Sequence, residues 1–190
     1  MDTIVLIAII GSALLIYLKY AAIIAAKNRA LEALSGIDVQ LTKRSDLIPN
    51  VLKIAKKFMA HEKELISEVT ALRAKTSGPY DPSDSAATKE HLDIASQLDS
   101  AMSRLMVSVE AYPELASDQT MLQAQQTYNE IEAQISAARR FYNSAVTELN
   151  NSIEIFPGSL IAGLTTAKTM PFYKADAANK APVDADEILD

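Results

Sequence analysis

Apolar residues follow two different patterns along the chain, first a continuous run and then a periodic one. From Ile4 the stretch "IVLIAIIGSALLIYL" carries no charge, and a further apolar run follows Lys19. A helix of about 20 apolar residues crosses a bilayer. The run therefore predicts a membrane-spanning helix over residues 3–20, with the ammonium group of Lys19 extending to the lipid headgroups. The membrane anchor as a whole covers residues 1–26.

Two other interpretations of this first segment are open, a cleaved signal peptide and a helix buried in a soluble domain. A signal peptide has a basic start and a small-residue cleavage site. Here Asp2 precedes the apolar run, and no Lys or Arg does. The missing basic start favours a retained anchor.

Charged residues around the span predict its orientation. Lys19, Lys27 and Arg29 follow the apolar run, whereas the acidic Asp2 precedes it. Basic residues near a span stay on the cytoplasmic side. We therefore expect a single-pass protein of a bacterial-type inner membrane, with a short N-terminus outside and the remaining chain in the cytoplasm.

Beyond the anchor, apolar residues recur every seven positions in three segments, which is the pattern of helices that pack along a common seam. The segments cover about residues 27–75, 86–112 and 119–156. Paired rows begin at Leu34 and Ile37, at His91 and Ala95, and at Met121 and Ala124. The last of these rows of large residues ends on Phe156. On the same segment Asn129, Ser136, Asn143 and Asn150 also recur every seven residues, as a polar flank or as a contact for a further helix.

Pro and Gly mark where these segments end. "TSGPYDPSDS" at Thr76–Ser85 predicts a loop, and Ser83 or Ser85 is placed to cap the next helix. Pro113 and "FPGS" at 156–159 end the second and third segments. The fold is therefore predicted as all-α, with an N-terminal transmembrane helix followed by an antiparallel bundle of three long helices with coiled-coil-like heptad packing. The bundle covers 27–168, and residues 169–190 form an extended or disordered tail.

The stretch "IDVQLTKRSDLIPN", residues 37–50, combines helical apolar spacing with charges and a proline. Two interpretations of Pro49 compete. A new helix could begin with Asp46 as its N-cap, which leaves Pro49 in the first turn. Alternatively one helix continues through Pro49, is kinked there, and leaves the Ser45 carbonyl without its usual donor. The second is favoured because both apolar rows keep their register across the proline.

Two charged residues, Arg44 and Glu62, occupy positions in the apolar rows. They lie about 27 Å apart along one helix, so each needs a partner on another helix or subunit. Alternatively, Arg44 extends outward between apolar neighbours. Polar residues of this segment form a candidate structural or interaction joint: Asp38, Gln40, Arg44, Asp46, Pro49, Asn50 and Glu62.

Composition removes several kinds of chemistry. The chain has no Cys, which excludes disulfides and thiolate ligands, and its net charge of −6 argues against nucleic acid as a partner. His61 and Glu64 have the spacing of a helical ligand pair, but no second histidine completes the zinc-protease pattern. No glycine-rich phosphate loop or nucleophile elbow occurs. We therefore expect no enzyme, no cofactor and no small-molecule substrate.

Four ordered blocks together resemble the LemA family. They are "IDVQLTKRSDLIPN", "HE" at 61–62, "ARRFYNSAV" at 138–146 and "FPGSLIAGL" at 156–164. The resemblance implies a small protein with an N-terminal membrane helix and a bundle of long helices, and it covers almost the whole chain. This chain departs from the family at Leu34, where members often carry Trp, and near Ser45, where they often carry an aromatic residue. The family has no agreed biochemical function, and some LemA-like proteins belong to membrane organelles such as magnetosomes.

Three functional hypotheses follow. The favoured one is a non-catalytic interaction protein, anchored in the bilayer by residues 3–20, that forms a homo-oligomer or docks another membrane protein. The second is a lipid-binding or membrane-shaping protein, which the basic residues Lys19, Lys27 and Arg29 favour. The third is an enzyme that uses the region of His61.

Overall fold

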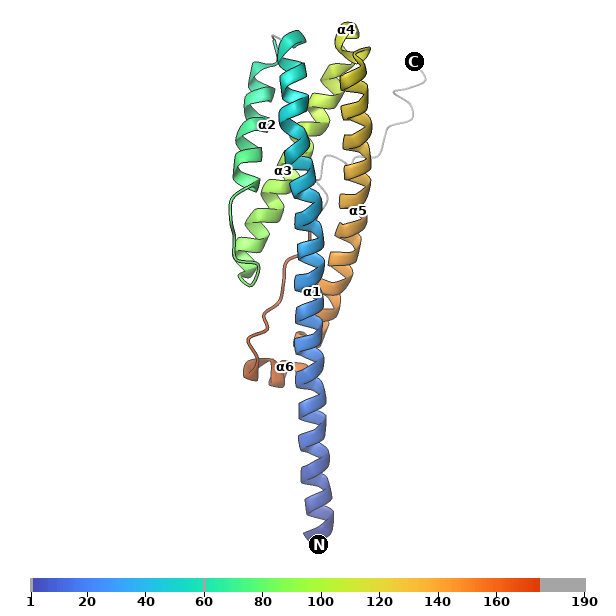
Figure 1. The fold of residues 1–190 in the computed structure, drawn as a ribbon. Coiled ribbons are helices and arrows are strands. Elements are labelled where there is room, and N and C mark those ends of the chain that lie inside the picture. The colour runs from blue at the N-terminus through green and yellow to red at the C-terminus, as the bar shows by residue number, and fades with distance from the viewer. Residues whose placement is uncertain (1, 60, 175–190) are drawn as a thin grey trace, which may run out of the picture.

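The computed structural model describes residues 2–59 and 61–174, and in these residues it contains helices and no strands. The predicted all-α fold is confirmed. Four helices make the body of the molecule (Figure 1): α1 (Asp2–Phe58), α2 (Lys63–Thr76), α3 (Ser85–Val109) and α5 (Gln119–Glu154). Three shorter elements complete it: α4 (Pro113–Ala116), α6 (Gly158–Ile161) and the 3-10 turn η1 (Ala162–Leu164).

Helix α1 is a single helix of 57 residues, about 85 Å long at about 1.5 Å per residue. Residues 3–22 are exposed, and Ile23 is the first buried side chain, at 1% exposure. Among the described residues, α1 is the one helix long and apolar enough to cross a membrane. Figure 1 shows its N-terminal part projecting alone from the bundle. The apolar run and the first bundle helix are therefore one continuous element.

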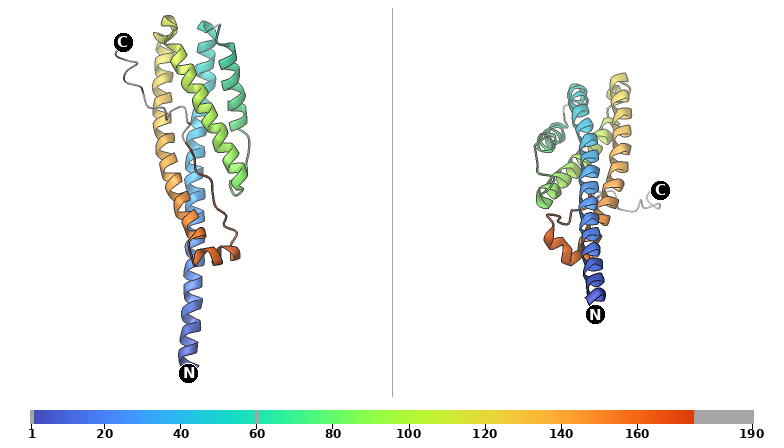
Figure 2. Two further views of the ribbon diagram at one scale, coloured as in Figure 1. Left: turned by 180° about the vertical axis from the view of Figure 1, so that it is seen from behind. Right: turned by 60° about the horizontal axis from the view of Figure 1, so that its bottom comes forward.

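The predicted helix over residues 27–75 is wrong at one point, because the chain turns back between Phe58 and Lys63. Here the amide of Glu62 donates to the carbonyl of Met59 at 3.2 Å. Glu62 is half-buried at this turn and does not lie in a packed seam. A charge in the apolar row weakens the packing that would extend the helix. The bundle therefore has α2 as a fourth, shorter helix, which runs back beside α3 (Figures 1 and 2).

The other element boundaries lie close to those predicted, with different capping residues. The loop between α2 and α3 covers residues 77–84, and the N-cap of α3 is Asp84, not Ser83 or Ser85. The carboxylate of Asp84 accepts a hydrogen bond from the amide of Ala86, because a short acidic side chain satisfies a free amide at a helix start. Pro113 begins α4, where its missing N–H costs little. The N-cap of α5 is Asp118.

The buried apolar residues form two main clusters along the bundle. The distal cluster, far from the N-terminus, packs α1 from Ile48 onward against α2, α3, α4 and the first part of α5. The proximal cluster packs residues 26–41 of α1 against the start of α3, the second half of α5 and the chain after η1. Between them α1 carries the buried Arg44. A polar layer therefore divides the core.

Residues 165–174 follow η1 without helical structure and lie against the bundle, with Met170 and Tyr173 buried. The side-chain amides of Asn143 and Asn150 bind this segment. The side chain of Asn143 donates to the backbone carbonyl of Tyr173 at 3.0 Å and accepts from the backbone N–H of Tyr173 at 2.9 Å. The side chain of Asn150 makes the same two bonds with the backbone of Met170, at 3.0 and 2.9 Å.

The distance between Asn143 and Asn150 along α5 matches the distance between Tyr173 and Met170 along the extended segment. Seven residues of helix and three of extended chain both cover about 10 Å. Asn143 and Asn150 therefore bind an extended segment, which is neither of the two roles expected for this row, whereas Asn129 is exposed, as expected of a polar flank. The remainder of the predicted tail, residues 175–190, lies outside the described residues.

Candidate functional site

Arg44 lies inside the bundle with 1% of its surface exposed and binds groups on two other helices. Its Nη1 atom lies 3.1 Å from a carboxylate oxygen of Glu132 on α5 and 3.5 Å from one of Asp99 on α3. Its Nη2 atom donates to the carbonyl of Ala95 at 2.9 Å. Arg44 therefore takes partners on other helices and does not extend to solvent, because a buried guanidinium is stable only when paired.

The charges around Arg44 do not balance, since two carboxylates face one guanidinium. Burial is the main cause that raises the pKa of Glu132 to about 7; Asp99 acts in the same direction, and Arg44 opposes both. Burial lowers the pKa of Arg44, but Glu132, Tyr173 and Asp99 outweigh this effect and hold it above its ordinary value. Arg44 is thus always charged, and Glu132 exchanges a proton near neutral pH.

The segment after η1 closes this polar layer. Tyr173 is 3% exposed, and the guanidinium of Arg139 lies 4.8 Å from the centre of its ring. The hydroxyl of Tyr142 also donates to the carbonyl of Pro171 at 2.8 Å. Charge, ring contact and hydrogen bonds together fix the extended segment against α5 at the level of Arg44.

Helix α1 continues through Pro49, which confirms the continuous helix and excludes a new start at Asp46. Pro49 has no N–H for the carbonyl of Ser45. This carbonyl instead accepts a hydrogen bond of 2.7 Å from Nε of Arg73 on α2. The proline thus creates an acceptor on α1 that holds α2 in place.

Asp38 joins α1 to the loop before α3 and to α3 itself. Its carboxylate accepts a hydrogen bond from the Tyr80 hydroxyl at 2.8 Å and lies 3.2 Å from Nε2 of His91. The rings of Tyr80 and His91 stack with centroids 4.0 Å apart. The Ser45 and Ser77 hydroxyls, 3.2 Å apart, add a second link from α1 to the loop. His91, which the heptad row places in the seam, is therefore a partner of Asp38.

The structure does not bring all the predicted joint residues together. Gln40 is half-buried, while Asp46, Pro49 and Asn50 are exposed. Of the basic residues near the span, Lys19 is exposed, Lys27 donates to the Thr166 hydroxyl at 3.1 Å, and Arg29 pairs with Glu148. Lys27 and Arg29 therefore hold the second half of the chain against α1.

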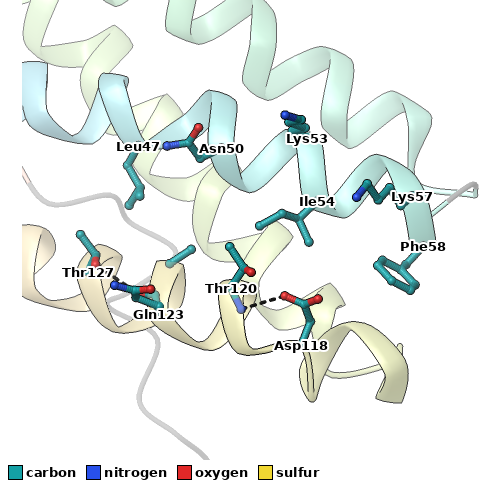
Figure 3. Close-up of a pocket in the computed structure, with 11 residues that line it drawn as sticks. Leu47, Asn50, Lys53, Ile54, Lys57, Phe58, Asp118, Thr120, Gln123 and Thr127 are labelled. Atoms are coloured by element: carbon teal, nitrogen blue, oxygen red, sulfur yellow. Dashed lines mark hydrogen bonds between the residues drawn. The ribbon is translucent and has the colours of Figure 1, made fainter.

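A groove between the distal ends of α1 and α5 is a second candidate site (Figure 3). Its cavity of about 520 Å³ is lined by Leu47, Asn50, Lys53, Ile54, Lys57, Phe58, Asp118, Thr120, Gln123, Ala124 and Thr127. In Figure 3, Ile54 and Phe58 point from α1 toward α5, while Lys53 and Lys57 come from the same helix at the edge. The α1 side of the groove is thus apolar with lysines beside it, whereas the α5 side contributes the polar residues Asp118, Thr120, Gln123 and Thr127.

Of the groove residues, only Asn50 was among the predicted joint residues. Lys53 and Lys57 carry a weak signal, since basic residues four apart lie on one face of a helix. The side of α5 that faces them could not be assigned before the fold was known. Among the described residues no three His, Cys, Asp or Glu side chains gather to hold a metal, and His61 is exposed at the turn before α2.

The fold defines a class, an all-α bundle built on one long helix with a membrane-type N-terminal part. Residues 33–186 match the model of the LemA family, and the chain belongs to this family, as its ordered blocks predicted. It is similar to magnetosome protein MamQ of Magnetospirillum gryphiswaldense, with 22% identity over 90% of this chain and 71% of the relative. Magnetosome protein MamQ 2 of Paramagnetospirillum magneticum is 23% identical, over 82% of this chain and 64% of the relative. Protein LemA of Metamycoplasma hominis is 25% identical, over 85% of this chain and 72% of the relative.

The raised pKa of Glu132 predicts a pH-dependent stability. A folded state that holds a carboxyl proton more tightly than the unfolded state gains stability below the ordinary pKa of 4.5 and loses it as pH rises to about 7. Glu132→Gln keeps an acceptor for Arg44 but cannot ionise. We expect the variant to become more stable relative to the parent chain as pH rises through this window, in unfolding measurements on the full chain in detergent.

The matched control is Glu68→Gln, because Glu68 forms an exposed ion pair with Arg104. This control should leave the slope of stability against pH unchanged. Parallel curves for Glu132→Gln and the parent chain would show that Glu132 does not take up a proton on folding.

Proposed function

We propose that this chain is a non-catalytic interaction protein, anchored in a membrane by the N-terminal part of α1, whose bundle docks an acidic partner segment. The observation that carries the proposal is the continuity of α1. One unbroken helix leads from the exposed apolar residues 3–22 to the groove, and Ile54 lies about 46 Å beyond Ile23 along its axis. Such a rod holds a docking surface at a fixed height above the bilayer.

The polar interior of the bundle supports a non-catalytic role. Arg44, Asp38 and the Ser45 carbonyl each have partners within the bundle. A catalytic acid or base must instead reach a substrate. These groups serve the alignment of the helices.

The groove supports docking through its charge and shape. Lys53 and Lys57 are exposed at the groove, where they outnumber its one carboxylate, that of Asp118. A partner with acidic residues beside apolar ones would pair with the lysines and cover Ile54 and Phe58. A second copy of this acidic chain is one source of such a segment, and another membrane protein is the other.

The relatives support a setting at a membrane organelle. Several proteins similar to this chain are named as magnetosome proteins, and we extend the proposal to a role at a specialised bacterial membrane. A membrane-shaping activity is the alternative function, and the exposed apolar part of α1 is the observation that favours it.

A photo-crosslinking amino acid at Lys53 tests the docking proposal. In native membranes we expect one discrete crosslinked product, which disappears in the charge-reversed variant Lys57→Glu because the acidic segment is repelled. Lys75→Glu on α2 is the matched control and should leave the product in place. Native mass spectrometry in detergent identifies a second copy or a different protein as the crosslinked species. The absence of a discrete product at Lys53 would contradict a docking groove.

For the orientation, we propose that the N-terminus lies outside and the bundle lies in the cytoplasm, because Lys19, Lys27 and Arg29 follow the span. The chain has no Cys, so a single cysteine at Ser117 reports on the distal end of the bundle. A maleimide that does not cross membranes should label it only after the cells are permeabilised. Labelling in intact cells would show that the bundle lies outside the cytoplasm and would contradict the proposed orientation.

A further inference from the structure

The segment that follows α5 exposes an unusual number of large apolar side chains. Residues 155–164 contain α6 and η1, and we call this segment the foot. Ile155, Phe156, Leu160 and Leu164 are 62%, 74%, 71% and 73% exposed. The seven-residue row predicts Phe156 in the packed seam, and this is wrong because α5 ends at Glu154, before Phe156. No charged residue occurs from Ile155 to Ala167.

The foot has a defined position on α1. Ile161 of the foot packs with Ile23 and Ala167 in a small cluster of buried residues. Figures 1 and 2 show α6 beside α1, at the level where the N-terminal part of that helix leaves the bundle. Lys27, one turn further along α1, donates to Thr166 just after the foot. These contacts place the exposed apolar side chains close to the end of the apolar part of α1.

The length of the apolar part places the membrane boundary at the same level. Residues 3–22 of α1 are exposed, and at about 1.5 Å per residue they cover about 30 Å, the thickness of the hydrocarbon layer of a bilayer. Ile23 is the next residue. With α1 anchored as proposed, the hydrocarbon layer ends between Lys19 and Ile23, and Ile23 packs with Ile161 of the foot.

The backbone holds the foot in one position. A Cβ atom at Gly158 would lie 2.0 Å from the carbonyl oxygen of Ser152, so only glycine allows α6 to pack this closely against the end of α5. The exposed apolar residues are thus presented by a packed turn, and a larger residue at 158 would displace it.

We propose that the foot is a second membrane contact, whose apolar side chains enter the interfacial layer of the leaflet that surrounds residues 19–23 of α1. The occupant is lipid, because the foot packs on α1 at Ile23, the residue that directly follows the exposed apolar part of that helix. With both α1 and the foot in contact with the same leaflet, the bundle cannot rotate freely about the axis of α1. The direction in which the groove between α1 and α5 faces is then fixed relative to the membrane. The inference rests on the proposed membrane anchoring.

The chain has no Trp, so single tryptophans report on depth without background. We would reconstitute the full chain with Leu160→Trp or Leu164→Trp in phosphatidylcholine and phosphatidylglycerol vesicles that carry bromine near the glycerol end or near the methyl end of the acyl chains. We expect quenching of both foot variants, stronger with the shallow bromines. Leu14→Trp, in the middle of the apolar part, should be quenched more strongly by the deep bromines.

Val107→Trp on α3 is the matched exposed control, since Val107 is 68% exposed and lies in the distal half of the bundle. It should not be quenched by either lipid. If Leu14→Trp is quenched and the foot variants are not, the anchor stands and the foot proposal is wrong. A foot variant with blue-shifted but unquenched emission is covered by protein, which also overturns the proposal. Loss of quenching at Leu14→Trp would instead overturn the anchoring itself.

Discussion

The pairing of one buried guanidinium with groups on two other helices is the constraint on which this bundle depends. A charge removed from water needs partners in good geometry, or it costs several kcal/mol. Arg44 meets this requirement only when Asp99 and Glu132 lie at its own height along the bundle. The two apolar clusters on either side provide most of the burial, but hydrophobic burial is non-directional and does not by itself fix one alignment. The polar layer between them selects one alignment.

The same logic explains the polar residues of "IDVQLTKRSDLIPN". Asp38 holds Tyr80 and His91, and the carbonyl freed by Pro49 holds Arg73. Each of these contacts joins α1 to an element that follows it in the chain, as Arg44 does. The stretch is a set of internal attachment points along one helix. Its density of charge is a property of the packing, as expected for a structural joint.

Periodicity predicted the parts of the fold that depend on local pattern. The apolar run, the long helix through Pro49 and the loop at 77–84 all carry their signals within a few residues. The turn between Phe58 and Lys63 carried almost none, because both apolar rows resume beyond it in the same register and the one charge near it in these rows, Glu62, resembles that of Arg44, where the helix continues. Asn143 and Asn150 were visible as a recurring polar position, but the extended segment that they bind lies about 20 to 30 residues away in sequence. From its position Arg44 was expected either to take a partner on another helix or to extend outward, and the fold was needed to decide between these and to identify Asp99 and Glu132. The groove was missed because it is formed by α1 and α5 together.

The free energy of unfolding of Arg44→Met at neutral pH tests the central role of this residue most directly. The variant leaves Asp99 and Glu132 facing each other without a cation, so we expect a loss on the order of 3–5 kcal/mol in chemical denaturation of the full chain in detergent. Arg104→Met on α3, which removes the cation of an exposed pair with Glu68, should cost less than about 1 kcal/mol. A loss for Arg44→Met no larger than that of this control would contradict the account.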